Sequence, residues 1–174
     1  MTGERLGGSS RRLYRFALTV FGRLPMPARR FVIRRVTPSW SAGAAAVIER
    51  DDGRWLMVRP VYRKGWGLPG GFIDRKELPA EAVRRELREE LGIEVDLDPN
   101  PWMVHDSTYR RLDTIFMARL ADGTDPDSIA IRTPELDDIG WFHPEEPPLL
   151  EHEAHDILTL RSLMIEGGHP ILMR

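Results

Sequence analysis

Apolar side chains near the start of the chain recur with the period of an α-helix. Six of them recur at spacings of three and four residues: Leu13, Phe16, Ala17, Val20, Phe21 and Leu24. This spacing places them on one face of a helix. Ser9 or Ser10 is a suitable N-terminal cap, and Pro25 is expected to end the helix.

The pattern changes after residue 40, where short apolar runs alternate with turn residues. The runs at 41–50 and 54–62 predict two strands, and Asp51-Asp52-Gly53 between them is typical of a hairpin turn. Further strands are predicted at 93–97, 102–107, 112–120 and within 129–142. A final helix is predicted at about 149–166. Strands mixed with helices in this order predict an α/β domain with a mixed sheet.

Another helix is predicted between Pro79 and Gly92. Proline is favourable at the first helical position, and glycine commonly follows the last one. Val83, Leu87 and Leu91 are four residues apart, so they form an apolar ridge suited to packing in the core.

Three carboxylates share one polar face of this helix. Glu86, Glu89 and Glu90 stand at positions i, i+3 and i+4, so their side chains are neighbours and repel one another. Arg85 and Arg88 flank them and offset only part of that repulsion. A divalent cation would make the arrangement favourable, because Mg²⁺ takes carboxylates, water and substrate phosphates as ligands. A solvated charged face with ion pairs is the alternative.

Glycines just before the helix favour the metal-binding interpretation. The stretch "WGLPGG" at 66–71 leaves the backbone nearly bare. Glycine lets a backbone approach a ligand closely, and it leaves a carbonyl free to face a metal. The glycines and the carboxylate face together therefore predict one binding site.

The combined motif resembles the signature of the Nudix hydrolases. In that signature a glycine is followed after five residues by Glu, and after seven more by Arg-Glu-apolar-x-Glu-Glu-x-Gly-apolar. Gly71, Glu77 and the run from Arg85 to Ile93 match all nine defined positions. One departure is Lys76, where family members often carry glycine. The resemblance covers about residues 40–165.

The resemblance implies a fold and a set of site residues. The fold is the Nudix α/β/α sandwich, with a mixed β-sheet between helices. The implied ligands of a Mg²⁺ or Mn²⁺ ion are the Gly70 carbonyl and the carboxylates of Glu86, Glu89 and Glu90. Glu86 or Glu89 is then the implied general base, acting through a bound water. Arg85 and Glu77 are the implied pair that orients the helix carboxylates.

In several Nudix subfamilies a downstream loop supplies the base or an extra metal ligand. The acidic residues of "TPELDDIGWF" are the candidates here, and Glu135 is favoured over Asp137 and Asp138. An exposed acidic turn is the alternative interpretation of this stretch.

Three residues are candidates for substrate binding. The Gly71 backbone can approach a ligand closely, and Arg59, like the nearby Tyr62 and Arg63, precedes the glycines and could meet phosphates or a base. Tyr109 stands sixteen residues after the motif, which is similar to a tyrosine of some dinucleoside polyphosphate hydrolases. Ordinary strand-end surface is the alternative for Arg59, Tyr62 and Arg63.

The charge distribution divides the chain. Residues 1–38 hold nine arginines and one glutamate, a net charge of +8, whereas the remainder carries a net charge of −10. We therefore predict a basic N-terminal helical arm at 1–38 and a Nudix hydrolase domain at 39–174. The arm is expected to pack on its own domain or on a second copy in a homodimer. A membrane surface is the less favoured partner.

Composition excludes several other classes. The chain has no cysteine, which removes disulfides, thiol catalysis and cysteine-ligated metals. No apolar run approaches the roughly 20 residues of a membrane span, and a cytoplasmic location is expected. "RRFVIRR" at 29–35 belongs to no recognisable nucleic-acid-binding motif, so no nucleic-acid partner is expected.

The resemblance to the Nudix hydrolases implies the function, which is metal-dependent hydrolysis of a diphosphate bond in a small nucleoside diphosphate-linked substrate. A catalytically inactive Nudix domain that binds or senses a nucleotide is the alternative. The intact set of Glu86, Glu89 and Glu90 with Arg85 favours the enzyme.

Overall fold

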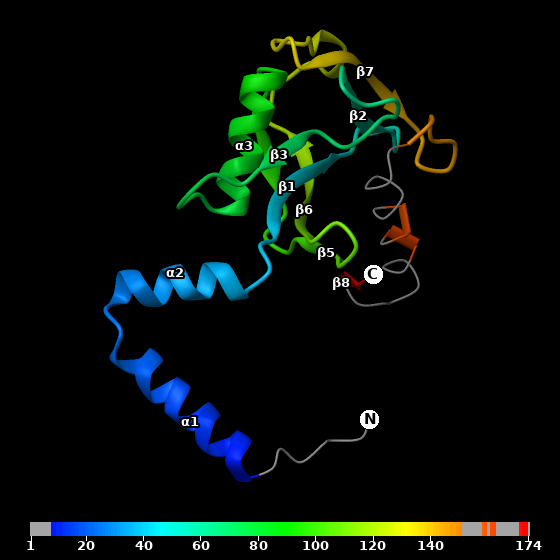
Figure 1. Ribbon diagram of the computed structural model, residues 1–174. Helices are drawn as coiled ribbons and strands as arrows, with labels where there is room; N and C mark the ends of the chain where they lie inside the picture. Colours follow the sequence, from blue (N-terminus) through cyan, green and yellow to red (C-terminus); the bar gives the residue numbers. More distant parts are fainter. Residues whose placement is uncertain (1–7, 151–157, 160, 163–170, 174) are drawn as a thin grey trace. The chain divides into compact units, whose positions relative to one another are not determined.

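The computed structural model describes residues 8–150, 158–159, 161–162 and 171–173 (Figure 1). The chain divides into two compact units, Met1–Ser39 and Trp40–Arg174. Most of the predicted final helix lies outside the described residues, although 158–159 and 161–162 are helical.

The first unit contains two helices, α1 (Gly8–Arg23) and α2 (Met26–Val36). Helix α1 ends before Pro25, as predicted. Helix α2 was not predicted, and it begins at once because proline is tolerated in a first helical turn. Arg29 joins the helices, since its guanidinium donates to the Gly22 carbonyl and lies 6.0 Å from the Phe21 ring. Among the described residues, no helix has the length and apolar character needed to cross a membrane.

The second unit is built on two sheets and one long helix, α3 (Pro79–Glu90). The strands are β1 (Ser41–Ile48), β2 (Trp55–Pro60), β3 (Gly70–Phe72), β4 (Val95–Leu97), β5 (Trp102–Asp106), β6 (Arg111–Leu120), β7 (Leu136–Phe142) and β8 (Ile171–Met173). The larger sheet has the order β3-β1-β6-β5-β8, with β4 also pairing with β6. Its β1–β6 and β5–β8 pairs are parallel and the others antiparallel, so the sheet is mixed. β2 and β7 form a second, antiparallel sheet (Figure 1).

The predicted turn between the first two strands forms, with Gly53 at φ +80°. Beyond this turn the strands do not pair along their length: Glu49, just after β1, makes one antiparallel bridge with Trp55 of β2. β6 pairs with the whole length of β1 on one edge, and β3 pairs with Gly43–Ala45 on the other edge. β2 pairs with β7 instead.

The core lies on both faces of β1. Ala44, Ala46 and Ile48 pack in one cluster with Val83 and Leu87 of α3. Val47, which lies between Ala46 and Ile48 in the strand, belongs to a second cluster, and Leu158 packs against that cluster. Alternate residues of a strand point to opposite faces, so helical residues lie on each side of the sheet. The predicted α/β class with a mixed sheet is confirmed.

Candidate active site

A cavity of about 270 Å³ lies between the glycines and helix α3. Its walls include residues from β1, β2, β3, α3 and β6, together with the segment before β7. The acidic residues in the lining are Asp74, Glu86, Glu90, Asp113 and Glu135. Gly70 and Gly71 also line the cavity, so the two halves of the sequence motif meet here.

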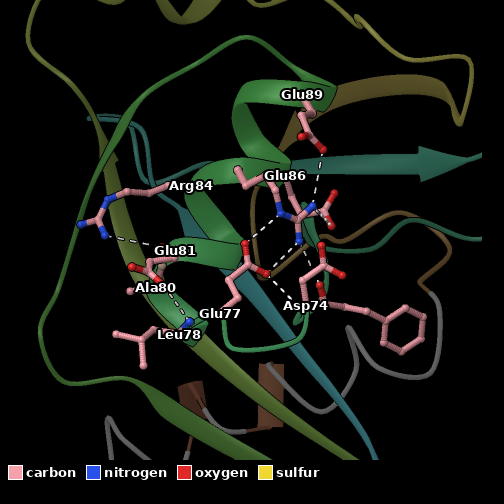
Figure 2. Close-up of polar contacts among 10 residues, drawn as sticks. Asp74, Glu77, Leu78, Ala80, Glu81, Arg84, Glu86 and Glu89 are labelled. Carbon is pink, nitrogen blue, oxygen red and sulfur yellow. Dashed lines mark hydrogen bonds and ion pairs between the residues drawn. The ribbon is translucent and has the colours of Figure 1, made fainter.

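Arg85 organises the helix side of this site. Its Nε and Nη2 donate to the two carboxylate oxygens of Glu77 at 2.9 and 3.1 Å. Nη1 donates to Glu86 Oε1 at 2.9 Å and to Glu89 Oε2 at 3.4 Å. Nη2 also reaches the Phe72 carbonyl at 3.1 Å, which ties α3 to β3. Figure 2 shows Glu77, Glu86 and Glu89 around this one guanidinium group.

The Glu77–Arg85 pair is itself anchored. The Asp74 backbone N–H donates to Glu77 Oε2 at 2.8 Å. The hydrogen bonds from Arg85 and then from Asp74 hold the pKa of Glu77 below its ordinary value, so Glu77 stays ionised. A bidentate carboxylate–guanidinium pair has one favoured geometry. Arg85 is therefore held in position to orient Glu86.

Gly71 provides the space that Glu86 occupies. A Cβ atom built on Gly71 would lie 2.3 Å from Glu86 Oε1. No other residue type leaves room for the carboxylate at this point. Glu86 is thus fixed against bare backbone on one side and by Arg85 on the other.

Glu90 is the electrostatically unusual member of the helix face. Burial, and after it the negative charges of Glu86, Glu135 and Glu89, raises the pKa of Glu90 from 4.5 to about 7. Its Oε2 atom is buried with no hydrogen-bond partner. A buried carboxylate oxygen facing further carboxylates is costly unless a positive charge joins it.

Glu135 reaches the site through the segment that precedes β7. The Arg132 backbone N–H donates to the Glu90 carbonyl at 2.7 Å, which docks this segment on the end of α3. Val61 N–H donates to the Glu135 carbonyl at 2.9 Å. Glu135 is consequently close enough to contribute to the raised pKa of Glu90.

The carboxylate oxygens around Glu90 are the type of ligand that a hard divalent cation prefers. Glu90 supplies an unpartnered buried oxygen, and the nearby carboxylates supply excess negative charge. Within the described part of the chain, no three acidic or histidine side chains already surround one point. Arg85 holds one oxygen each of Glu86 and Glu89, so those two carboxylates would have to turn to share an ion with Glu90.

The other predicted site residues lie outside the cavity lining. Glu89 is on the same face of α3, with its side chain 62% exposed. Arg59 pairs with Asp137 at 2.8 Å and Asp138 at 3.3 Å. Tyr109 lies in the turn after β5 and is 65% exposed. The structure thus brings Glu135 to the cavity and leaves Arg59 and Tyr109 away from it, whereas Tyr62 and Arg63 do line it.

A polar pair in the cavity lining, Arg111 and Asp113, was not predicted from the sequence. Asp113 is buried and accepts a hydrogen bond from Arg111 Nε at 2.8 Å, and both residues line the cavity. The Arg111 guanidinium lies 5.7 Å from the ring of Phe72. Gly43 on β1 makes room, because a Cβ there would lie 2.2 Å from Asp113 Oδ1. The two-residue spacing of Arg111 and Asp113 in the sequence predicts that they share one face of a strand. The burial of Asp113, however, depends on β1, the parallel strand that pairs with β6.

Comparison with known proteins identifies the family. Residues 40–163 match the model of the NUDIX domain. The chain therefore belongs to the NUDIX domain family, and it is a Nudix hydrolase. Proteins of this family generally use a divalent metal ion.

Relatives and solved structures agree with this identification. The MutT-like protein of Streptomyces ambofaciens is 30% identical over 132 residues, covering 76% of this chain and 82% of that protein. The nucleoside triphosphatase NudI of Salmonella heidelberg is 32% identical over 131 residues, covering 68% and 91%. A MutT NUDIX hydrolase from Burkholderia pseudomallei superposes with a TM-score of 0.57 at 27% identity, covering 70% and 98%. A NUDIX hydrolase from Nitrosomonas europaea has the same fold, with a TM-score of 0.64 at 18% identity, covering 79% and 80%.

Proposed function

We propose that the protein hydrolyses a phosphoanhydride bond of a nucleoside di- or triphosphate-type substrate with the help of Mg²⁺ or Mn²⁺. The observation that carries the proposal is the set of carboxylates gathered around Glu90, beside a cavity walled by glycines. Such excess negative charge favours a bound divalent cation and, through it, an anionic phosphate substrate. The names of the MutT-like and nucleoside triphosphatase relatives support a nucleotide as the substrate.

The proposed roles combine the family signature with the contacts of Arg85. Glu86, Glu89, Glu90 and the Gly70 carbonyl would hold the ion, and Arg85 with Glu77 would position Glu86. A bound ion would neutralise phosphate charge and lower the pKa of a coordinated water. Water attacks phosphorus, its proton passes to a carboxylate, and the bridging oxygen leaves with the departing phosphate group.

The candidates for the proton acceptor are Glu86, Glu89 and Glu135. Glu86 and Glu135 line the cavity, whereas Glu89 is largely exposed. A general base must come within hydrogen-bond reach of the attacking water. This requirement favours Glu86 or Glu135 for the role and leaves Glu89 as a metal ligand.

The part of the lining formed by Phe72, Arg111 and Asp113 is suited to the nucleoside end of the substrate. Phe72 is 61% exposed and offers a ring face for stacking. Arg111, oriented by the buried Asp113, offers guanidinium N–H groups in a fixed plane. The Phe72 carbonyl accepts a hydrogen bond from Arg85, and this contact fixes the position of Phe72 relative to the carboxylates of α3.

Turnover assays with carboxylate variants test the proposal. The protein is incubated with Mg²⁺ or Mn²⁺ and ribo- and deoxyribonucleoside triphosphates, nucleotide sugars, ADP-ribose or dinucleoside polyphosphates. Products are resolved chromatographically, so that release of pyrophosphate with a nucleoside monophosphate is distinguished from release of phosphate. We expect one substrate class to turn over, and Glu86→Gln and Glu89→Gln to lower kcat by roughly a hundredfold or more.

Glu94→Gln is the matched control. Glu94 lies just beyond the same helix and pairs with Arg88 at 2.7 Å, away from the cavity. The control should keep wild-type turnover. Turnover at the wild-type rate in all three variants would show that the helix face is not the catalytic site.

A further inference from the structure

The basic arm, residues 1–38, presents large apolar side chains that its own two helices do not cover. On α1, Leu13 is 71% exposed, Phe16 66% and Val20 44%. These residues belong to the single apolar stripe of α1, since they stand at steps of three and four. Burial of such a stripe in an apolar environment stabilises the helix that carries it.

The second helix adds to this surface. No residue of α2 is buried. Phe31 is 60% exposed and Val36 is 75% exposed. The guanidinium of Arg35 lies 5.3 Å from the Phe31 ring, so a charged group and an aromatic ring share one part of the helix surface.

The charge of the arm is of one sign. All nine of its basic residues are arginines, and no acidic residue occurs between Glu4 and Glu49. The pKa of an arginine side chain is far above neutrality, so the described helices carry positive charge without an internal counter-ion. The complementary partner must therefore be anionic.

We propose that the basic arm binds the surface of a bilayer that contains anionic lipids, with α1 and α2 lying in the interface. An exposed stripe of Leu, Phe and Val needs an apolar phase, which lipid acyl chains offer and a nucleic acid does not. Guanidinium groups pair in bidentate fashion with lipid phosphates, while their aliphatic stems remain among apolar groups. Helices of this composition bind at membrane surfaces without crossing them. The proposal does not depend on the activity of the Nudix domain.

Vesicle co-flotation of the full chain tests the proposal. The vesicles consist of phosphatidylcholine alone or of phosphatidylcholine with phosphatidylglycerol. We expect binding to the anionic vesicles at low ionic strength, weak binding to the neutral ones, and a loss of affinity as salt rises. The variant Arg12→Gln/Arg15→Gln should bind roughly 25-fold more weakly, at about fivefold for each arginine.

A second pair of variants separates charge from apolar contact. Leu13→Ser/Phe16→Ser keeps every charge and should still lose at least tenfold in partitioning, because the stripe no longer enters the acyl region. Arg119→Gln and Leu149→Ser, at exposed positions of the other unit, serve as controls and should bind as the wild type does. All variants should keep solution turnover.

The other partners give different results. Absence of binding to anionic vesicles, or equal binding by all variants, would overturn the proposal. Concentration-dependent dimerisation that Leu13→Ser/Phe16→Ser abolishes, without vesicle binding, would assign the surface to a second copy. Binding to single-stranded RNA with no effect of the Leu13 and Phe16 changes would assign the arginines to nucleic acid.

Discussion

The raised pKa of Glu90 links the proposed ion site to the stability of the folded protein. Its carboxyl has a pKa of about 7 in the folded protein and 4.5 as the ordinary value. Below pH 4.5 the group is protonated in both states. As pH rises toward 7 the unfolded chain releases the proton and the folded protein retains it, so stability falls. Above pH 7 the folded protein without metal carries the full penalty of a buried charge near other carboxylates.

Glu90→Gln should therefore stabilise the metal-free protein at alkaline pH. We expect a gain on the order of 2 kcal/mol at pH 8, which shrinks toward zero near pH 5. Urea unfolding of both proteins in EDTA at the two pH values measures this difference. Adding Mg²⁺ should raise the stability of the wild type at pH 8 and that of Glu90→Gln much less. A variant less stable than the wild type at pH 8 in EDTA would contradict the electrostatic account.

At this scale the sequence predicted that the motif carboxylates share a helix face, but it did not predict their environment. Glu86, Glu89 and Glu90 share a helix face because their spacing requires it. The burial that raises the pKa of Glu90 depends on how the segment at 129–135 docks on α3, and no local pattern encodes this docking. The same holds for Asp113, whose burial depends on Gly43 in a strand 70 positions earlier.

At the scale of elements, the approach of β3 to β1 shapes the site. Gly70 pairs with Ala45 across these strands and has φ +147°. A Cβ on Gly70 would lie 2.3 Å from the Ala44 carbonyl oxygen and 2.6 Å from Ala45 Cα. These are backbone atoms of a central strand, so they cannot move aside as a flexible side chain can. The close approach places the adjacent Gly71 against Glu86.

Gly70→Ala should consequently be severely destabilising. We expect a loss of about 3 kcal/mol or more from the strained backbone and the steric conflict. Gly53→Ala is the matched control, since Gly53 also has a positive φ, +80°, but a Cβ on it would meet no atom within 4 Å beyond the adjoining residues. That variant should lose only about 1 kcal/mol. Chemical denaturation measures the free energy of unfolding of both variants. Equal losses of stability would show that backbone conformation alone, without the steric conflict, accounts for the requirement for glycine at position 70.

Element prediction succeeded where the signal was local. The α3 boundaries followed from Pro79 and Gly92, and the positions of β1, β2, β4, β5, β6 and β7 followed from apolar runs. β3 (Gly70–Phe72) and β8 (Ile171–Met173) were not predicted, because β3 lies in the glycine-rich stretch and both strands are only three residues long. The predicted turn formed, but extended pairing of β1 with β2 did not, because β2 pairs along its length with β7, a strand distant in the sequence. Helix α2 was missed because Pro25 was interpreted as a stop, although proline is equally suited to the start of a helix.

At the scale of the whole molecule, the two units differ in what stabilises them. The unit Trp40–Arg174 has two apolar clusters on opposite faces of a sheet. Helix α2 has no buried residue, and short helices without packed apolar faces are marginally stable in water. The domain boundary predicted between residues 38 and 39 stays a prediction, as does the cytoplasmic location.

Limited trypsin digestion should therefore begin in the basic arm. Local opening of α1 and α2 requires little free energy, which makes their arginines accessible to the protease. We expect the first stable product to begin near Val36, after Arg35, and to keep its turnover number. Mass spectrometry identifies the first residue of the product, and parallel activity assays measure its turnover number. Early cleavage within Trp40–Arg174 would contradict the boundary, whereas slower cleavage of the arm in the presence of anionic vesicles alone would link its helices to the lipid surface.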